Sequence, residues 1–361
     1  MSVYKRSDRI NHNNNKRAAR ADFIKSTDIS EIYLLFAAKK EEMKVVRRRQ
    51  QQQQQPSTIT VGQNIADYEL LIKDLKKRGY TVIDRQGRGA SAVVFRAETE
   101  NKRGTTAVVA IKVLSGKDAA ACWAREVAAL RKLAPAKCPH VPRLLDCFAW
   151  TSADAVSFHA LVTPFYDGGT LRDLLNRRGP LSERTCTEIF PQLVEAVAVA
   201  HAAGIAHCDI KAENILLTST RDVVLCDWGL CELEEPQRCM VTRGTMAYAS
   251  PELARQMIER HRINRLPSGE REARNAERLS RRKPYDALAC DSWALGLMLW
   301  IMATGRHPFD ANTNEEIYRR ITRSRNILAA EQAAQPENAN LWEVIDNLMP
   351  EKPEQRWLVR C

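Results

Sequence analysis

The sequence lacks the patterns that would place the protein in a membrane, in a secretory pathway or in a zinc-binding class. Its longest apolar run, WALGLMLWIMA at 293–303, is about half the length that a helix needs to cross a bilayer. The first ten residues contain no apolar stretch typical of a secretory signal. The ten cysteines form no C-x-x-C pair and have no histidines at zinc-ligand spacing. We therefore expect a soluble protein without a membrane span, with reduced thiols, in the cytoplasm, the nucleus or both.

The body of the chain also lacks a basic excess. The formal net charge is +11, but residues 1–55 carry 13 Lys and Arg against 6 Asp and Glu, and residues 255–284 carry 10 against 4. The remainder of the chain is slightly negative. This distribution argues against a protein that coats nucleic acid along its length. Nucleic acid remains an alternative partner only through the basic N-terminal segment.

A polar N-terminal extension, followed by strand-like and then helix-like sequence patterns, predicts the domain organisation. Residues 1–64 are rich in Asn, Gln and basic residues, and we expect them to be largely disordered with one helix. Short β-branched runs then give way to long helical patterns. We predict an α+β fold in one domain over 65–361, with a small β-rich N-terminal lobe at about 80–163, a linker at 164–169 and a larger helical C-terminal lobe at 170–361.

Residues 206–217, AHCDIKAENILL, crowd acids, a lysine and an amide ahead of an apolar run. Taken singly, Asp209 is typical of a turn and Asn214 of a helix cap. Lys112 lies in the apolar strand pattern VVAIKV, where its ammonium needs an anionic partner. Glu126, in the helical pattern that follows, can supply one.

Gly87 and Gly89 lie between two strand patterns. A plain hairpin turn explains them as well as a binding loop does. No helix follows them and no Gly-Lys-Ser/Thr is present, which excludes the dinucleotide and Walker loops. The remaining binding alternative is a hairpin whose backbone N–H groups approach phosphate oxygens.

In their order along the chain, these motifs resemble those of the eukaryotic-type protein kinases, and Lys211 and Gly244-Thr245 resemble the serine/threonine branch. The resemblance covers about residues 80–357. It rests on Gly87-x-Gly89-x-x-Ala92-x-Val94, Val109-Ala110-Ile111-Lys112, His207-Cys208-Asp209-Ile210-Lys211-x-x-Asn214, Asp227-Trp228-Gly229 and Ser250-Pro251-Glu252, followed by Asp291-x-Trp293-x-x-Gly296 and Arg356.

The resemblance implies a bilobal protein-kinase-like fold and ATP-dependent phosphorylation of serine or threonine hydroxyls on protein substrates. It implies that Asp209 is the catalytic base, that Lys211 contacts the transferring phosphoryl group, and that Lys112, fixed by Glu126, holds the α- and β-phosphates. It assigns ATP to Gly87, Gly89, Val94, Ala110, Lys112, Thr163, Pro164 and Tyr166, and Mg²⁺ (or Mn²⁺) to Asn214 and Asp227. The alternative is a pseudokinase scaffold that binds partners through its basic appendages.

Two departures from the family pattern carry further expectations. Cys208 replaces the arginine that in relatives helps to hold a phosphate on the activation loop. We therefore hypothesise that activity does not need phosphorylation of that loop. The Arg-rich insertion at about 255–284 is either a solvated helix or a docking surface for an acidic partner.

Two acidic residues carry expectations that also follow from the resemblance. Glu213 predicts a preference for protein substrates with Arg or Lys before the acceptor. Glu252 is expected to form a buried ion pair with Arg356.

Overall fold

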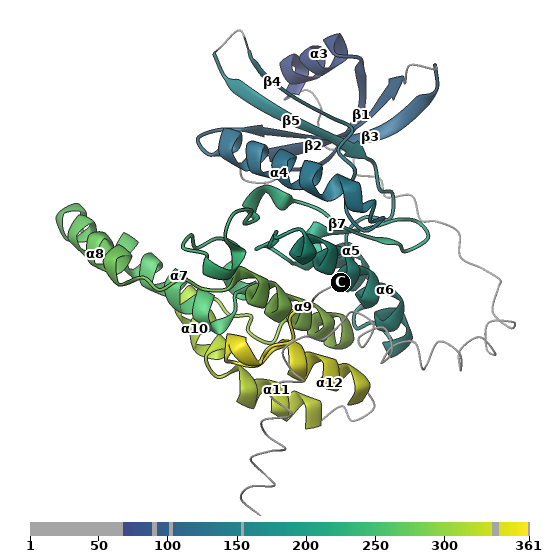
Figure 1. Cartoon of the computed structure of the whole chain (residues 1–361). Coiled ribbons are helices and arrows are strands. Elements are labelled where there is room, and N and C mark those ends of the chain that lie inside the picture. Colours follow the sequence, from purple (N-terminus) through teal and green to yellow (C-terminus); the bar gives the residue numbers. More distant parts are fainter. Residues whose placement is uncertain (1–67, 89–91, 101–103, 153–154, 334–338, 360–361) are drawn as a thin grey trace, which may run out of the picture.

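The computed structural model has two lobes, a small one built on a sheet and a larger helical one (Figure 1). It describes residues 68–88, 92–100, 104–152, 155–333 and 339–359. The α+β, bilobal fold predicted from the sequence is confirmed. The predicted disorder of the extension at 1–64 and the call on Gly89 lie outside the described residues.

The small lobe is a five-stranded antiparallel sheet with the order β1-β2-β3-β5-β4. Helix α3 (Glu69–Lys77) packs on its outer face, and α4 (Ala119–Leu133) lies between the sheet and the large lobe (Figure 1). The strands are β1 (Tyr80–Arg88), β2 (Ala92–Glu100), β3 (Thr106–Ser115), β4 (Asp146–Thr151) and β5 (Ser157–Pro164).

Alternation along β2 and β3 separates a core face of the sheet from a half-buried face. Val93 and Phe95 are buried, as is Ile111 on the neighbouring strand, and all three pack with leucines of α3. Val94 and Lys112 have the opposite parity and are only half-buried. Since successive strand side chains point to opposite faces, the residues of the second set face the other side of the sheet.

The large lobe is formed by helices around a short hairpin of β6 (Ile215–Leu217) and β7 (Val223–Leu225). Every residue of α9 (Ala287–Thr304) is buried, because this helix is apolar on all sides. It is long and apolar enough to cross a membrane by composition, yet it lies wholly inside the fold. The apolar run at 293–303 therefore belongs to a helix of the protein core. The other helices are α5 (Leu171–Arg178), α6 (Glu183–Ala202), α7 (Pro251–Asn264), α8 (Ser268–Arg281), α10 (Asn314–Ile321), α11 (Ser324–Ala333) and α12 (Ala339–Leu348).

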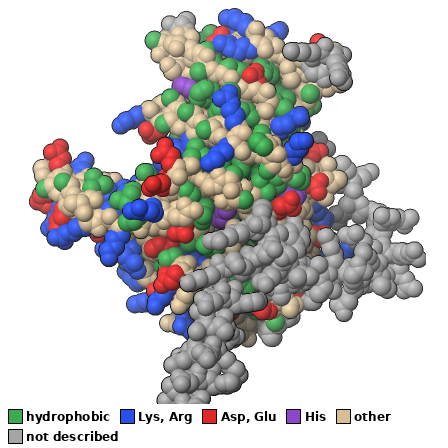
Figure 2. Space-filling model, viewed as in Figure 1, with side chains coloured by type: hydrophobic (Ala, Val, Ile, Leu, Met, Phe, Trp, Pro, Cys, Tyr) green, Lys and Arg blue, Asp and Glu red, His purple; other side chains and the backbone are tan. Residues whose placement is uncertain are grey.

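The Arg-rich insertion forms the end of α7 and all of α8, which projects from the lobe as an arm (Figure 1). No residue of α8 is buried. Basic, acidic and apolar side chains are intermixed on this arm (Figure 2), and Glu277 pairs with Arg274 and Arg281. The exposure of α8 fits both a solvated helix and a docking surface, whereas α7 buries residues such as Met257 and Ile258.

Candidate active site

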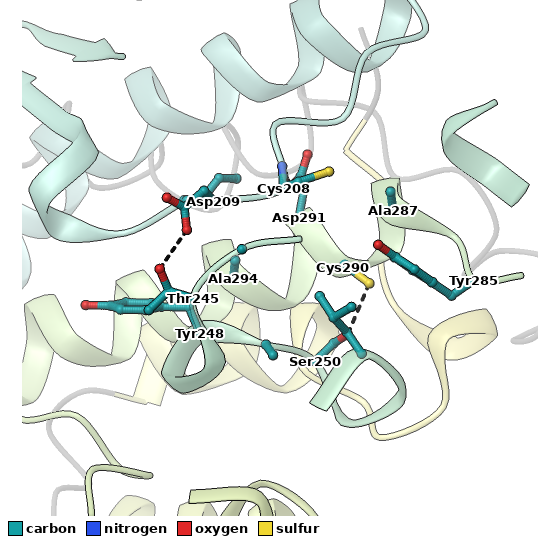
Figure 3. Close-up of a pocket in the computed structure, with 14 residues that line it drawn as sticks. Cys208, Asp209, Thr245, Tyr248, Ser250, Tyr285, Ala287, Cys290, Asp291 and Ala294 are labelled. Atoms are coloured by element: carbon teal, nitrogen blue, oxygen red, sulfur yellow. Dashed lines mark hydrogen bonds between the residues drawn. The ribbon is translucent and has the colours of Figure 1, made fainter. Parts of the chain in front are cut away.

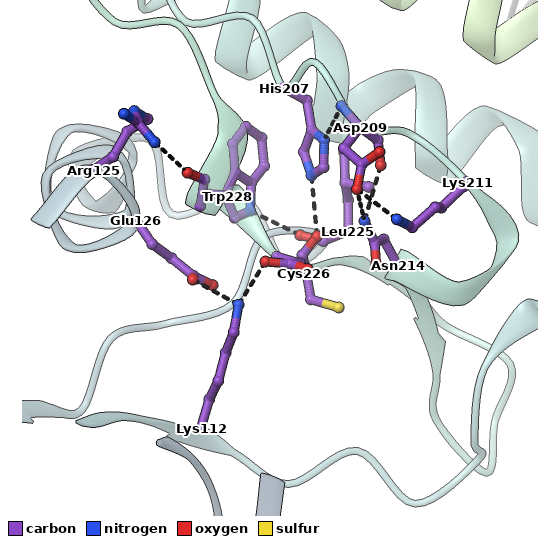
Figure 4. Close-up of polar contacts among 12 residues, drawn as sticks. Lys112, Arg125, Glu126, His207, Asp209, Lys211, Asn214, Leu225, Cys226 and Trp228 are labelled. Atoms are coloured by element: carbon purple, nitrogen blue, oxygen red, sulfur yellow. Dashed lines mark hydrogen bonds and ion pairs between the residues drawn. The ribbon is translucent and has the colours of Figure 1, made fainter. Parts of the chain in front are cut away.

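Three charged side chains from distant parts of the chain meet between the lobes (Figure 4). Lys112 of β3 donates to Glu126 Oε2 of α4 at 2.8 Å and to Asp227 Oδ1, just after β7, at 2.5 Å. The Glu126 side chain is 7% exposed and that of Asp227 is 42% exposed. One carboxylate thus anchors the ammonium from inside, while the other faces the space between the lobes.

The contacts among Lys112, Glu126 and Asp227 determine how their pKa values shift. Burial opposes the charge on Lys112, but Glu126 and Asp227 outweigh it and raise the pKa of the ammonium. Burial likewise opposes the charge on Asp227, and Lys112 outweighs it, so the pKa of this carboxyl is lowered. Burial raises the pKa of Glu126, against the attraction of Lys112. The cluster therefore presents a cation and an ionised aspartate at neutral pH.

A second polar group lies on the loop between α6 and β6 (Figure 4). Asp209 Oδ2 accepts a hydrogen bond from Lys211 at 2.6 Å and one from the Asn214 amide at 3.2 Å. Thr245, 36 residues further on, donates to Asp209 Oδ1 at 2.8 Å and accepts from Lys211 at 3.1 Å. The Asp209 side chain is only 4% exposed, so these donors hold its carboxylate in one orientation. The predicted loop residues are therefore brought together.

Two sets of contacts that support the site were not predicted. Asp291 of α9 accepts from the backbone N–H groups of His207 and Cys208 at 2.7 and 2.9 Å, and His201 of α6 lies 3.1 Å from it. Arg125, next to Glu126, donates to the carbonyl of Gly229 at 2.6 Å and so ties α4 to the Asp227 segment. Asp291 was noted only as a family landmark, and nothing local in the sequence indicates which backbone it binds.

The sheet brings five predicted nucleotide-binding residues into neighbouring register. Gly87 pairs with Val94, Val94 with Lys112, and Ala110 with Thr163. The same face of the sheet as Lys112 carries three half-buried residues, Val94, Ala110 and Thr163. Cross-strand partners, and residues two apart in a strand, lie on the same face. These three residues therefore form part of a surface on the same side of the sheet as the ammonium.

The linker begins at Pro164, the last residue of β5, and leads through Tyr166 to α5. Among the described residues, no hydrogen-bond acceptor is found for the backbone N–H of Tyr166. Gly168 passes so close to the β6 strand that a Cβ atom would lie 2.6 Å from the Leu217 carbonyl. Only glycine fits at this point, so the path of the linker is set by contact with the large lobe.

The donor atoms suit a hard divalent cation. Asp227 supplies ionised carboxylate oxygens, and Asn214 uses its amide nitrogen toward Asp209, which leaves its amide oxygen as an acceptor. Carboxylate and amide oxygens are ligands that Mg²⁺ accepts, usually with several waters and substrate phosphates. No cluster of three His, Cys, Asp or Glu residues with metal-binding geometry occurs among the described residues. The protein alone therefore offers a partial site.

Cys208 precedes Asp209 on the loop and lines a cavity of about 20 Å³ together with Tyr285, Ser250 and Cys290 (Figure 3). Its backbone is in the left-handed region, with φ of 65°. Burial raises the pKa of the Cys208 thiol, so this side chain brings no charge to its position before Asp209. Gly244 crosses close by, and a Cβ atom there would lie 2.4 Å from the Cys208 carbonyl.

Arg172 connects three elements at the edge of the site. It lies in the first turn of α5, where Thr170 and Asp173 form a capping box. Its Nε donates to Glu213 Oε1 at 3.1 Å and one terminal nitrogen donates to the Tyr248 hydroxyl at 2.8 Å. Neither Arg172 nor Tyr248 was singled out as a partner of Glu213 in the sequence.

The expected ion pair between Glu252 and Arg356 is confirmed. The two terminal nitrogens of Arg356 donate to the two Glu252 oxygens at 2.6 and 2.7 Å. The Arg356 side chain is fully buried.

A family model for the protein kinase domain matches residues 80–360. The chain belongs to the protein kinase family. It is similar to the serine/threonine-protein kinase RAD53 of Saccharomyces cerevisiae, with 29% identity over 73% of this chain and 29% of that protein. It is also similar to the CBL-interacting protein kinase 4 of Oryza sativa subsp. japonica, with 31% identity over 66% of this chain and 47% of that protein.

A further relative is the NUAK family SNF1-like kinase 1 of Homo sapiens, with 29% identity over 51% of this chain and 23% of that protein. The chain thus spans less than half the length of these curated relatives. These names give no support to the scaffold alternative. Family membership implies the use of ATP and a divalent metal in general terms.

Proposed function

We propose that this chain phosphorylates serine or threonine hydroxyls of protein substrates with ATP. The single observation that carries the proposal is the meeting of Lys112, Glu126 and Asp227 beside the Asp209 loop, which is hydrogen-bonded to the residue before Asp227. Phosphoryl transfer needs little covalent chemistry from the protein, which mainly positions groups and neutralises charge. Both tasks match the residues described above.

In this proposal Asp209 accepts the proton of the substrate hydroxyl, because hydrogen bonds from Lys211 and Thr245 orient its carboxylate. Lys211 places a positive charge beside the transferring phosphoryl group. Lys112, fixed by Glu126, binds the α- and β-phosphates. When bound, a divalent ion supplies neutralisation of phosphate charge, and Asn214 and Asp227 would hold it.

The sheet and the linker would bind the nucleotide. Gly87 and Val94 lie at the end of the β1–β2 ladder nearest the Lys112 pairing, and Ala110 and Thr163 continue the same face. Tyr166 would donate its backbone N–H to the adenine, and Pro164 would offer its carbonyl because proline has no N–H. Gly89 keeps its assignment as a prediction.

The test of the proposal is a phosphate-transfer assay with the full chain, labelled ATP, Mg²⁺ and a generic serine/threonine peptide. Asp209→Asn removes the proton acceptor while keeping the shape, so we expect the rate to fall by about 10²-fold or more. Binding of ATP should change little, because Asp209 contacts the acceptor side. Equal rates for Asp209→Asn and the unaltered protein would contradict the assignment.

We also propose that the Arg-rich insertion at about 255–284 binds an acidic partner, in support of which α8 presents Arg274 and Arg281 to solvent. The check is whether partner recovery falls when both arginines are changed to glutamine and stays unchanged when they are changed to lysine. A location in the cytoplasm or nucleus stays a prediction.

A further inference from the structure

Resting on the proposed kinase function, we propose that Arg172 is a specificity-determining residue that occupies Glu213 and so limits the selection of basic protein substrates. Glu213 alone, an acid on the catalytic loop, would attract a cation of an incoming peptide. In this protein an internal cation is already there.

The pair lies where a peptide must pass. Glu213 follows Lys211 by two residues on the loop, and Tyr248 follows Thr245 by three residues on the segment that faces it. Lys211 and Thr245 both contact Asp209. A peptide whose hydroxyl reaches Asp209 therefore runs beside the Arg172–Glu213 pair.

A cation of a substrate peptide can compete with Arg172 for Glu213. The side chains of Arg172 and Glu213 are 33% and 46% exposed, so a peptide guanidinium can reach the carboxylate. Each contact of Arg172 is a single hydrogen bond rather than a two-pronged one. Exposed ion pairs of this kind are weak. A substrate cation can therefore bind Glu213 about as strongly as Arg172 does.

The local charges favour Glu213 in its ion pair with Arg172 over a Glu213 that is free to bind a substrate cation. Partial burial opposes the charge of Arg172, but Tyr248 and Glu213 outweigh it and raise the pKa of the guanidinium. Arg172 is thus charged at every physiological pH. His307 packs edge-on against Tyr248, with ring centroids 5.1 Å apart, and burial lowers its pKa to about 4. His307 is therefore neutral at pH 7, and Arg172 is the cation that sets the charge beside Glu213.

The experiment compares matched peptides that carry Arg or Ala at each position before the acceptor, using the full-length protein. We expect Arg172→Gln to raise the ratio of kcat/KM for basic over neutral peptides by about two- to fivefold, mainly through a lower KM for the basic peptide. Arg172→Lys keeps the internal cation and should stay close to the unaltered protein. Glu213→Gln in the Arg172→Gln background should abolish the gain.

An unchanged or lower ratio in Arg172→Gln, with measurable turnover, would overturn the proposal. So would a parallel loss of kcat for both peptides, because that result indicates a role only in bracing Tyr248. If Arg172→Gln does not fold, a ratio in Arg172→Lys below that of the unaltered protein would have the same consequence. An absence of turnover in the unaltered protein would instead contradict the proposed kinase function.

Discussion

Arg356 is the residue at which charge and burial conflict most directly. Its guanidinium is fully buried, and its charge is balanced by Glu252 and by carbonyl acceptors at Pro350, Ala289 and Glu351. The ring of Trp293 lies 5.2 Å from it. Burial opposes the charge of Glu252, and Arg356 outweighs it and lowers the pKa of this carboxyl. Removing one partner leaves the other as an uncompensated buried charge.

We therefore expect Glu252→Gln to lower the free energy of unfolding by about 3–5 kcal/mol, because Arg356 loses its counter-ion. Denaturant unfolding measures this change. The matched control is Glu277→Gln on α8, whose exposed pairs with arginine should contribute less than about 1 kcal/mol. Similar losses in the two variants would show that the buried pair has no special role.

At the scale of elements, the end of the insertion is joined to the segment that carries Thr245. Cys239 and Tyr285 exchange backbone hydrogen bonds at 2.8 and 3.1 Å, and the Tyr285 hydroxyl donates to the Val241 carbonyl at 2.7 Å. Arg282 donates to the Thr242 hydroxyl, and Arg260 donates to the Thr242 carbonyl at 3.2 Å. These contacts tie the segment that carries Thr245 to the end of the insertion. The hypothesis drawn from Cys208 predicts that they suffice for activity.

We expect Arg282→Gln to lower kcat/KM by roughly two- to tenfold, because the loss of a hydrogen bond loosens the segment that orients Asp209. Phosphatase treatment of the unaltered protein should leave its activity unchanged. Steady-state kinetics on one peptide measures both. Arg281→Gln, on the exposed side of α8, is the control. Loss of activity on dephosphorylation, or equal effects of the two variants, would contradict this account.

For the whole molecule, the ion pair between Lys112 and Asp227 joins the two lobes. A ligand that binds both lobes stabilises the folded state by mass action, by about 2.7 kcal/mol at a hundredfold excess over Kd. We therefore expect ligand binding to stabilise the two lobes together.

We expect ATP with Mg²⁺ to raise Tm by several degrees, and Asp227→Asn to abolish the part of the increase that depends on Mg²⁺. Thermal melts with ATP plus Mg²⁺ and with ATP plus a chelator separate the two parts. Asp222→Asn, an exposed change in the turn before β7, is the control. A Mg²⁺-dependent increase that persists in Asp227→Asn would remove Asp227 from the metal site.

Several features follow from sequence because they depend on spacing along the chain. Strand alternation in β2 and β3, the buried character of α9 and the short loop from Asp209 to Asn214 are all local patterns. The Lys112–Glu126 and Glu252–Arg356 pairs were predicted through the family resemblance, and both are present.

Other features depend on which distant elements pack together. Three contacts join residues that lie between 40 and 84 positions apart in the sequence. They link Asp291 to the loop backbone, Arg282 to Thr242, and Arg172 to Glu213. No periodicity or local motif encodes such partners. The sequence by itself determined the lobes, the order of the charged motifs and the family, because local propensity and residue chemistry suffice for these. Only the tertiary structure decided that Glu213 is already paired, because that pairing depends on where the first turn of α5 docks against the loop.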